Sequence, residues 1–282
     1  VSAKGSAYGL RTANASSTSL GSNLTIAEVE GEKAYGLSAE DDDLTVSGTT
    51  TVTGILGTDT AVALSIDGGR ASFADVLIAE VDATEKSALV SAKSGAEVSI
   101  DSGIIRSAAI DAPLAYEGNF GSDVDADTEV NHINRIALRS VSGSSINLGQ
   151  SSDQGGRFTI VGDIVAGRGT QSESESGTIS INAGEGSSIY GDVYAGNGGQ
   201  ITLNLSGSVL EGQIDDYHEL ATGTAESDSF RNAAFYDDDG NAIAVEEAGS
   251  VHLTLADSSK WVARGQSFVE KLTFADASSV VD

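Results

Sequence analysis

The sequence contains no cysteine, no methionine and one proline, Pro113, among 282 residues. Without cysteine the chain can form no disulfide, no thiolate metal site and no cysteine nucleophile. Proline cannot donate a hydrogen bond into a β-ladder, so its near absence agrees with a chain that is mostly strand. Aromatic residues make up only 5% of the sequence, whereas glycine occupies 34 positions. This composition is atypical of a compact helical or α/β domain.

Positive charge and long apolar runs are also scarce. The chain has 15 Lys and Arg against 42 Asp and Glu, a formal net charge of -27. Such a charge repels phosphate backbones and anionic membranes, so we expect no nucleic-acid partner. No stretch approaches the roughly 20 apolar residues that a membrane-spanning helix needs, so we expect no membrane insertion. Because the sequence begins with Val1 and has no methionine, we expect it to be part of a longer protein.

Short segments in which apolar and small polar residues alternate recur along the whole chain. Examples are LTIAEV at 24–29, VALSIDGG at 62–69 and ITLNL at 201–205. Alternation over about four to eight residues, closed by Gly, Asn, Asp or Ser, is typical of strands with one buried face. The 39% of hydrophobic residues is enough for an ordered core. The sequence therefore predicts an all-β chain.

Internal repeats indicate how these strands are arranged. IYGDVYAG at 189–196 repeats IVGDIVAG at 160–167 and continues as LEGQI at 210–214, while AYGL occurs at 7–10 and 34–37. Repeats at an uneven period of about 20 to 50 residues are typical of solenoids. A parallel β-helix tolerates loops of any length between its stacked strands. We therefore predict a single-stranded parallel β-helix with extruded loops and about 20 residues per coil.

The repeat assigns structural roles to particular positions. Inward aliphatic residues are expected to stack in successive coils, and glycine to let the backbone bend at a corner. The aliphatic positions are Ile160, Ile189, Leu210, Ile164, Val193 and Ile214, and the corner glycines are Gly162, Gly191 and Gly212. We expect Asp192 and Tyr194 to face solvent, and Asp163 to be an outward neighbour of Asp192. The only tryptophan, Trp261, is expected to cap or close the last coils.

Two long polar segments interrupt the repeat. Residues 117–139 and 213–248 are expected to leave the coils as surface loops, and the alternation resumes after them. Neither segment resembles a linker between domains. We therefore expect one continuous solenoid, with coils and two insertions over residues 1–248 and the C-terminal coils over residues 249–282.

Alternating acids in the first insertion are the strongest candidate for metal binding. In an extended segment Asp123, Asp125, Asp127 and Glu129 would line one face and offer oxygen ligands to Ca²⁺. A run of acids at 237–239 is a weaker candidate. Neither has the spacing of a helix-loop-helix calcium site, and a solvated acidic loop is the alternative interpretation.

The same acids leave an enzymatic alternative open. Polysaccharide lyases and pectin hydrolases use parallel β-helices that collect carboxylates, calcium and a basic residue on one face, and Arg135 follows the acidic run. Few aromatic residues are available to stack on sugars. The chain has 3 histidines and no GxSxG motif, so a Ser-His-Asp mechanism has no support. The sequence favours a protein without catalytic residues and without a cofactor, with calcium as the one possible ligand.

The C-terminal residues carry a family resemblance. SSKWVARGQSFVEKLTFADASSVVD at 258–282 resembles the end of autotransporter passenger domains of the pertactin type, and the AYGL, GDIVAG and GDVYAG repeats look like the coils upstream of it. The resemblance implies a right-handed, pectin-lyase-like parallel β-helix. It implies export by type V secretion through an outer-membrane β-barrel to the surface of a Gram-negative bacterium. It also implies that residues 249–282 correspond to the autochaperone-like region, which seeds folding outside the cell.

Together these observations predict an adhesin, a self-association module or a rigid stalk without catalytic activity. The expected partners are host or bacterial cell-surface molecules, or further copies of the chain, and the outer-membrane barrel in the full-length protein. Two alternatives stay open, namely a calcium-assisted polysaccharide lyase or hydrolase and an inert spacer for an N-terminal domain.

Overall fold

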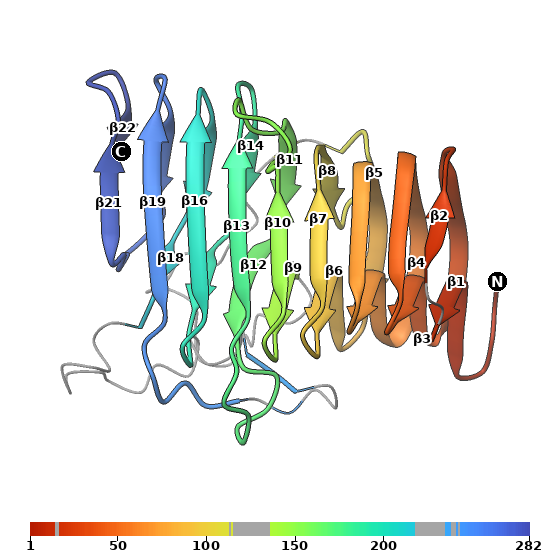
Figure 1. Ribbon diagram of the computed structural model, residues 1–282. Helices are drawn as coiled ribbons and strands as arrows, with labels where there is room; N and C mark the ends of the chain where they lie inside the picture. Colours follow the sequence, from red (N-terminus) through yellow and green to blue (C-terminus); the bar gives the residue numbers. More distant parts are fainter. Residues whose placement is uncertain (15–16, 113, 115–135, 218–234, 238–240, 242) are drawn as a thin grey trace.

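The computed structural model describes residues 1–14, 17–112, 114, 136–217, 235–237, 241 and 243–282. Within these ranges the chain is all β and has no helix, as the alternating sequence predicts. Consequently the described residues include no helix long and apolar enough to cross a membrane. The strands run side by side from one end of the molecule to the other (Figure 1).

The described residues form 22 strands, which every strand-to-strand pairing joins in parallel into one sheet. In chain order they are β1 (Ser6–Ala13), β2 (Thr18–Leu20), β3 (Leu24–Glu40), β4 (Asp43–Asp67), β5 (Arg70–Ala83), β6 (Lys86–Lys93), β7 (Glu97–Ile100), β8 (Gly103–Arg106), β9 (Ile136–Val141), β10 (Ser145–Leu148), β11 (Phe158–Val161), β12 (Asp163–Gly167), β13 (Thr178–Ala183), β14 (Ser188–Tyr190), β15 (Val193–Ala195), β16 (Gln200–Ser206), β17 (Val209–Gly212), β18 (Ile214–Asp215), β19 (Ser250–Ala256), β20 (Lys260–Ala263), β21 (Lys271–Phe274) and β22 (Val280–Val281).

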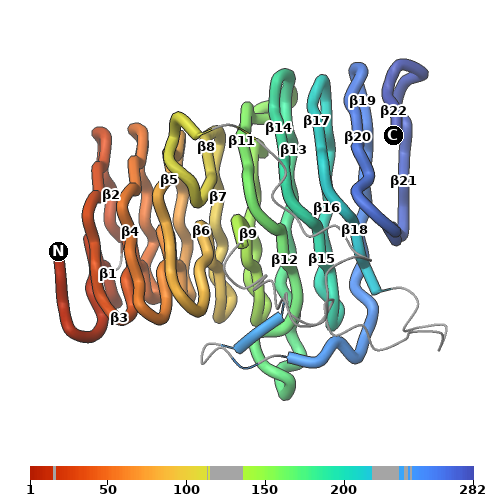
Figure 2. The backbone as a smooth tube through the Cα atoms, turned by 180° about the vertical axis from the view of Figure 1, so that it is seen from behind, coloured from red at the N-terminus to blue at the C-terminus, as the bar shows by residue number. Residues whose placement is uncertain are grey.

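The pairings sort the strands into three columns. Column 1 stacks β2, the starts of β4 and β5, β7, β10, β13, β16, β19 and β21. Column 2 stacks the first part of β3, the middle of β4, the end of β5, β8, β11, β14, β17, β20 and β22. Column 3 stacks β1, the ends of β3 and β4, β6, β9, β12, β15 and β18. We call the strands at one level of the columns a rung. Seen from behind, the rungs follow one another in chain order (Figure 2).

The length of a rung differs between the two halves of the molecule. In column 3 Lys33 pairs with Thr60 and Thr60 with Lys86, so these rungs are 27 and 26 residues apart. In column 1 Ile179 pairs with Ile201, a step of 22 residues. In these N-terminal rungs β4 continues as one strand through all three columns. The predicted coil of about 20 residues therefore describes some of the C-terminal rungs, such as the step from Ile179 to Ile201, whereas the N-terminal rungs are longer.

One aliphatic core runs inside the three columns along the stack, and the last strands, β21 and β22, lie beyond it. Its buried residues form a contiguous cluster from Ala7 to Trp261, composed almost entirely of Ala, Val, Ile and Leu. Parallel strands hold equivalent side chains about 4.8 Å apart, so apolar residues in register cover one another. Ile189, for example, pairs with Ile160 on one side and Leu210 on the other, and all are fully buried.

The repeated motifs of the sequence lie on top of one another. Val193 pairs with Ile164 and with Ile214, so the second aliphatic position of the motif also forms a stack. The AYGL segment at 7–10 likewise lies against the one at 34–37. Within these stacks the register is kept, because an offset of one residue would turn every inward side chain outward. Register shifts occur at Gly31/Lys33, Val46/Thr49 and Asp163/Ile164.

The two polar interruptions are shorter than the sequence indicated. The prediction that all of residues 117–139 leave the stack is wrong, because β9 is a fully buried strand of column 3 between β6 and β12. Residues 213–248 are likewise not all loop. Strand β18 belongs to column 3, and Phe235, Tyr236 and Ile243 are buried in a second apolar cluster on the outside of that column. Residues 115–135 and 218–234 lie outside the described residues.

Replacing Gly191 with alanine should destabilise the fold, because a Cβ there would lie 2.1 Å from the carbonyl oxygen of Gly162 in the preceding rung. We expect a loss of about 1–3 kcal/mol in the free energy of unfolding, the usual effect of overpacking. Gly5 is the matched control, since a Cβ at that position meets nothing within 4 Å. Urea denaturation followed by circular dichroism measures both variants. Equal stability of Gly191→Ala and Gly5→Ala would contradict the stacked corner.

Candidate functional site

The predicted calcium ligands Asp123, Asp125, Asp127 and Glu129 lie outside the described residues, and so does Arg135. In the part of the chain that the structure describes, no group of three or more His, Cys, Asp or Glu could hold a metal ion. The calcium site and the lyase site therefore stay predictions.

Asp163 and Asp192 stand at the corner between columns 2 and 3, and the prediction that they face solvent is wrong. Their exposed fractions are 3% and 1%. The backbone N–H of Asp192 donates to Asp163 Oδ1 at 3.0 Å, and that of Gln213 donates to Asp192 Oδ1 at 2.7 Å. Each carboxylate thus binds the backbone of the next rung. Alternation fails here because it holds within a strand, whereas these residues stand at the junction of two strands.

Tyr194 was also expected to face solvent and is instead buried, with 5% of its surface exposed. Its hydroxyl donates to Asp192 Oδ2 at 3.1 Å, and its ring belongs to the apolar cluster with Phe235 and Tyr236. The outer face of column 3 is therefore covered at this level. The GDVYAG motif therefore packs against the neighbouring rungs and against this apolar cluster. Its residues are buried, so it contributes no exposed site.

Trp261 lies in column 2 near the C-terminal end of the core. It pairs in register with Leu210 on one side and Val281 on the other, and is 4% exposed. Its indole N–H donates to the carbonyl oxygen of Gly212 at 3.0 Å. The ring therefore fills the core where the aliphatic stack ends, and its polar edge satisfies a backbone group of the preceding rung.

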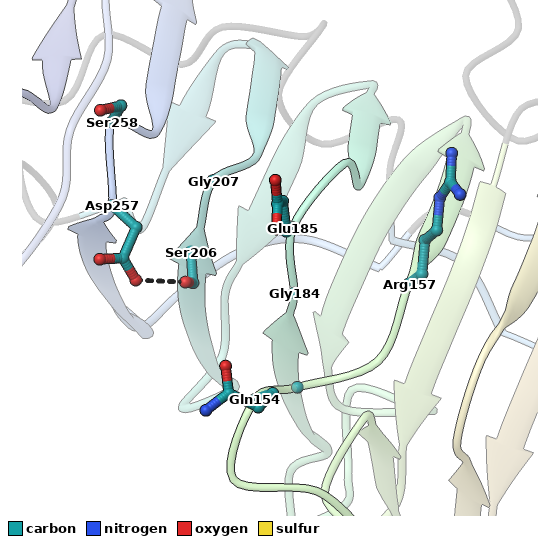
Figure 3. Close-up of a pocket in the computed structure, with 9 residues that line it drawn as sticks. Gln154, Arg157, Gly184, Glu185, Ser206, Gly207, Asp257 and Ser258 are labelled. Carbon is teal, nitrogen blue, oxygen red and sulfur yellow. Dashed lines mark hydrogen bonds between the residues drawn. The ribbon is translucent and has the colours of Figure 1, made fainter.

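A groove of about 810 Å³ crosses the turns between columns 1 and 2 on four successive rungs. Figure 3 shows the residues that line it, which come from the turns before β11, β14, β17 and β20 and, for Ser206, from the end of β16. The polar ones are Gln154, Arg157, Glu185, Ser206, Asp257 and Ser258. Amide, guanidinium, carboxylate and hydroxyl groups thus follow one another along the groove. Such a surface can exchange hydrogen bonds with a polar, extended partner.

The groove is held at its C-terminal end by ordered hydrogen bonds. Ser206 Oγ donates to Asp257 Oδ2 at 2.6 Å, a bond between neighbouring rungs (Figure 3). The backbone N–H of Asp257 donates in turn to Asp276 Oδ2 at 2.5 Å in the last turn. Asp276 Oδ1 accepts the N–H groups of Ser278 at 2.7 Å and Ser279 at 3.0 Å. The turns of three successive rungs are therefore linked by two aspartates.

These donors change the titration of Asp276. The side-chain hydrogen bond from Ser278 is the largest cause, and backbone N–H groups add to it, so that the pKa of Asp276 is lowered from 3.8 to about 2. Hydrogen bonds to the charged form favour that form. The negative carboxylate is thus the form that holds the last turn.

No protein-family model, no curated protein and no solved structure matches this chain. The resemblance to autotransporter passengers accordingly depends on residues 258–282 and on the AYGL, GDIVAG and GDVYAG repeats alone. The sequence carries no local signal for the groove, because the residues of the groove stand in four turns that are separated by about 20 to 50 positions. Only the stacking of the rungs brings these turns together.

The stability of the C-terminal end should depend on pH through Asp276. Its folded pKa of about 2 lies below the ordinary 3.8, so its contribution is present above about pH 4 and is lost as the pH falls toward 2. We expect Asp276→Asn to lower the melting temperature at pH 7. The further fall in melting temperature between pH 4 and pH 2 should be smaller in this variant than in the unmodified chain. Thermal unfolding at both ends of this window measures the effect. The exposed Asp111→Asn is the control, and a parallel pH profile of the two variants would contradict the assignment.

Proposed function

We propose that this chain is a right-handed, single-stranded parallel β-helix that acts as the surface-displayed passenger of a Gram-negative autotransporter. Its role is that of an adhesin-type rod, which contacts cell-surface molecules or other copies of itself and has no catalytic activity. The observation that carries the proposal is the stack of parallel rungs around one aliphatic core.

The shape of the stack supports a rod. The nine levels of column 1 follow chain order from β2 to β21, and at about 4.8 Å per level they span about 40 Å. The N-terminus and the C-terminus lie at opposite ends (Figure 1). A rod of this kind keeps the groups attached to its two ends apart.

The surface supports a contact role beyond that of a spacer. The net charge of -27 keeps such rods soluble and prevents indiscriminate association. The groove between columns 1 and 2 presents Arg157 and Glu185 on neighbouring turns of this acidic rod. Opposite charges at fixed positions provide orientation and selectivity for a partner. We therefore assign the adhesive contact to this groove.

Cells that display the chain should aggregate or bind host cells more than cells that display the translocating barrel alone. The double variant Arg157→Ala/Glu185→Ala should reduce this adhesion several-fold, because it removes both charged groups of the groove. Arg11→Ala/Glu40→Ala is the matched control, since it removes one ion pair of 2.9 Å on an exposed part of column 3 and leaves the net charge unchanged. Sedimentation of cell suspensions and counts of bound cells measure the effect.

Two results would contradict this function. Adhesion equal to that of the barrel alone would indicate an inert spacer. Formation of unsaturated products from polyuronides in the presence of calcium would indicate a lyase.

A further inference from the structure

The groove between columns 1 and 2 runs along the axis of the rod and crosses the turns of successive rungs. Its lining comes from four rungs, so it extends over three rung spacings, about 14 Å. Figure 3 shows Arg157, Glu185 and Ser258 along one side and Gln154, Ser206 and Asp257 along the other. A ligand in this groove therefore spans several rungs and meets side chains on both of its sides.

The lining of the groove offers no apolar anchor. Three of the lining residues are glycine, namely Gly155, Gly184 and Gly207, and the others that the structure describes are polar. Protein partners bind mainly through large aromatic or aliphatic side chains and arginine that fill desolvated pockets. The bare glycine backbone and the polar side chains of this groove form no such pocket. A partner must therefore be recognised by hydrogen bonds.

The backbone of these turns is already used in bonds between rungs. The N–H of Gly184 donates to the carbonyl oxygen of Gly156 at 2.8 Å. The N–H groups of Gly186 and Gly207 donate to the carbonyl oxygens of Gly207 and Ala256, at 3.0 and 3.1 Å. A peptide that binds as an added strand needs the unpaired N–H and C=O groups of a sheet edge. Side chains, and not the backbone, must therefore bind the ligand.

Four of the polar side chains end in a planar fork. They are the amide of Gln154, the guanidinium of Arg157 and the carboxylates of Glu185 and Asp257. Planar forks make two parallel hydrogen bonds to a matching pair of atoms. Adjacent hydroxyl groups of a sugar ring present such a pair, and each hydroxyl can both donate and accept. The guanidinium can donate to the pair, a carboxylate can accept from it, and the amide can do both.

Three of these forks are available without loss of a contact. Gln154, Arg157 and Glu185 are exposed, and in the described part of the chain their side chains take part in no ion pair or hydrogen bond. Asp257 is held in position by the bond that Ser206 Oγ donates to its Oδ2 at 2.6 Å. A ligand with hydroxyl groups therefore replaces water at the forks and leaves the turns as they are.

The charge of the groove selects among sugars. The two carboxylates of Glu185 and Asp257 outnumber the single guanidinium of Arg157, and the whole chain has a net charge of -27. An anionic chain such as a polyuronide is repelled by such a surface. A polycation is attracted by the acidic surface as a whole, and Arg157 opposes it in the groove. A neutral sugar chain meets neither obstacle.

We propose that the groove binds a neutral oligosaccharide, whose linked sugar rings lie along the axis of the rod. Gln154, Arg157, Glu185 and Asp257 hold pairs of adjacent hydroxyl groups, and the glycines let the rings approach the backbone. This inference rests on the proposed function for the choice of the groove as the contact surface. It adds the class of ligand, a neutral glycan of a cell surface.

Saturation-transfer NMR of the purified chain tests the proposal. The probes are neutral tetrasaccharides of glucose, mannose and N-acetylglucosamine, with the monosaccharides, tetragalacturonate and tetralysine for comparison. We expect saturable binding of at least one neutral tetrasaccharide and weaker binding of its monosaccharide, because one ring reaches fewer rungs. Gln154→Ala and Glu185→Ala should each weaken the binding of that tetrasaccharide about twofold to tenfold, the effect of losing one or two hydrogen bonds.

Matched controls separate the groove from general effects on the surface. Gln266→Ala and Glu32→Ala remove the same chemical groups at exposed positions outside the groove, and both variants should bind as the unmodified chain does. Three results would overturn the proposal. They are no saturable binding of a neutral tetrasaccharide, binding of tetragalacturonate or tetralysine alone, and equal effects of the groove variants and their controls.

The failure of this inference is distinguishable from a failure of surface adhesion. Adhesion of displaying cells that is lost in Arg157→Ala/Glu185→Ala, without binding of any neutral tetrasaccharide, would reject the glycan and retain the adhesin. Binding of a tetrasaccharide that is weakened in Glu185→Ala, without adhesion of displaying cells, would retain the glycan site and reject the adhesin.

Discussion

The structure depends on the stacking of equivalent side chains between parallel strands in register. The backbone ladder sets the distance between rungs, and this distance lets each aliphatic side chain cover the one below it. Ile160, Ile189 and Leu210 show the principle, since all three are fully buried although each strand is only three or four residues long. A single rung could not bury its apolar face, so stability arises between neighbours.

This constraint extends to the corners, where polar groups take part in the stack. Asp163 and Asp192 accept backbone N–H groups of the following rung, and Trp261 donates to Gly212 of the preceding one. Buried backbone groups need partners, and at a corner the strand ladder cannot supply all of them. Carboxylates and an indole N–H therefore perform there the role that the ladder performs within strands.

Side chains on the outer faces of the columns do not have to pack in register inside the core. Any specificity of the molecule for a binding partner must therefore lie on these faces. The groove between columns 1 and 2 arises because each rung contributes one or two side chains to a row that the stack aligns. The groove carries mixed charge and suits an extended polar partner.

The strand content, the parallel stacking of the GDIVAG and GDVYAG repeats and the aliphatic positions of those repeats could be predicted from the sequence, because alternation and repetition are local properties. The same patterns misplaced Asp192, β9 and the length of the N-terminal rungs, since these depend on where the chain turns. Gln154, Glu185 and Asp257 become neighbours along the groove only through the stacking of the rungs. Which outward residues become neighbours depends on the number of residues in every intervening rung and insertion, and no local pattern encodes that number.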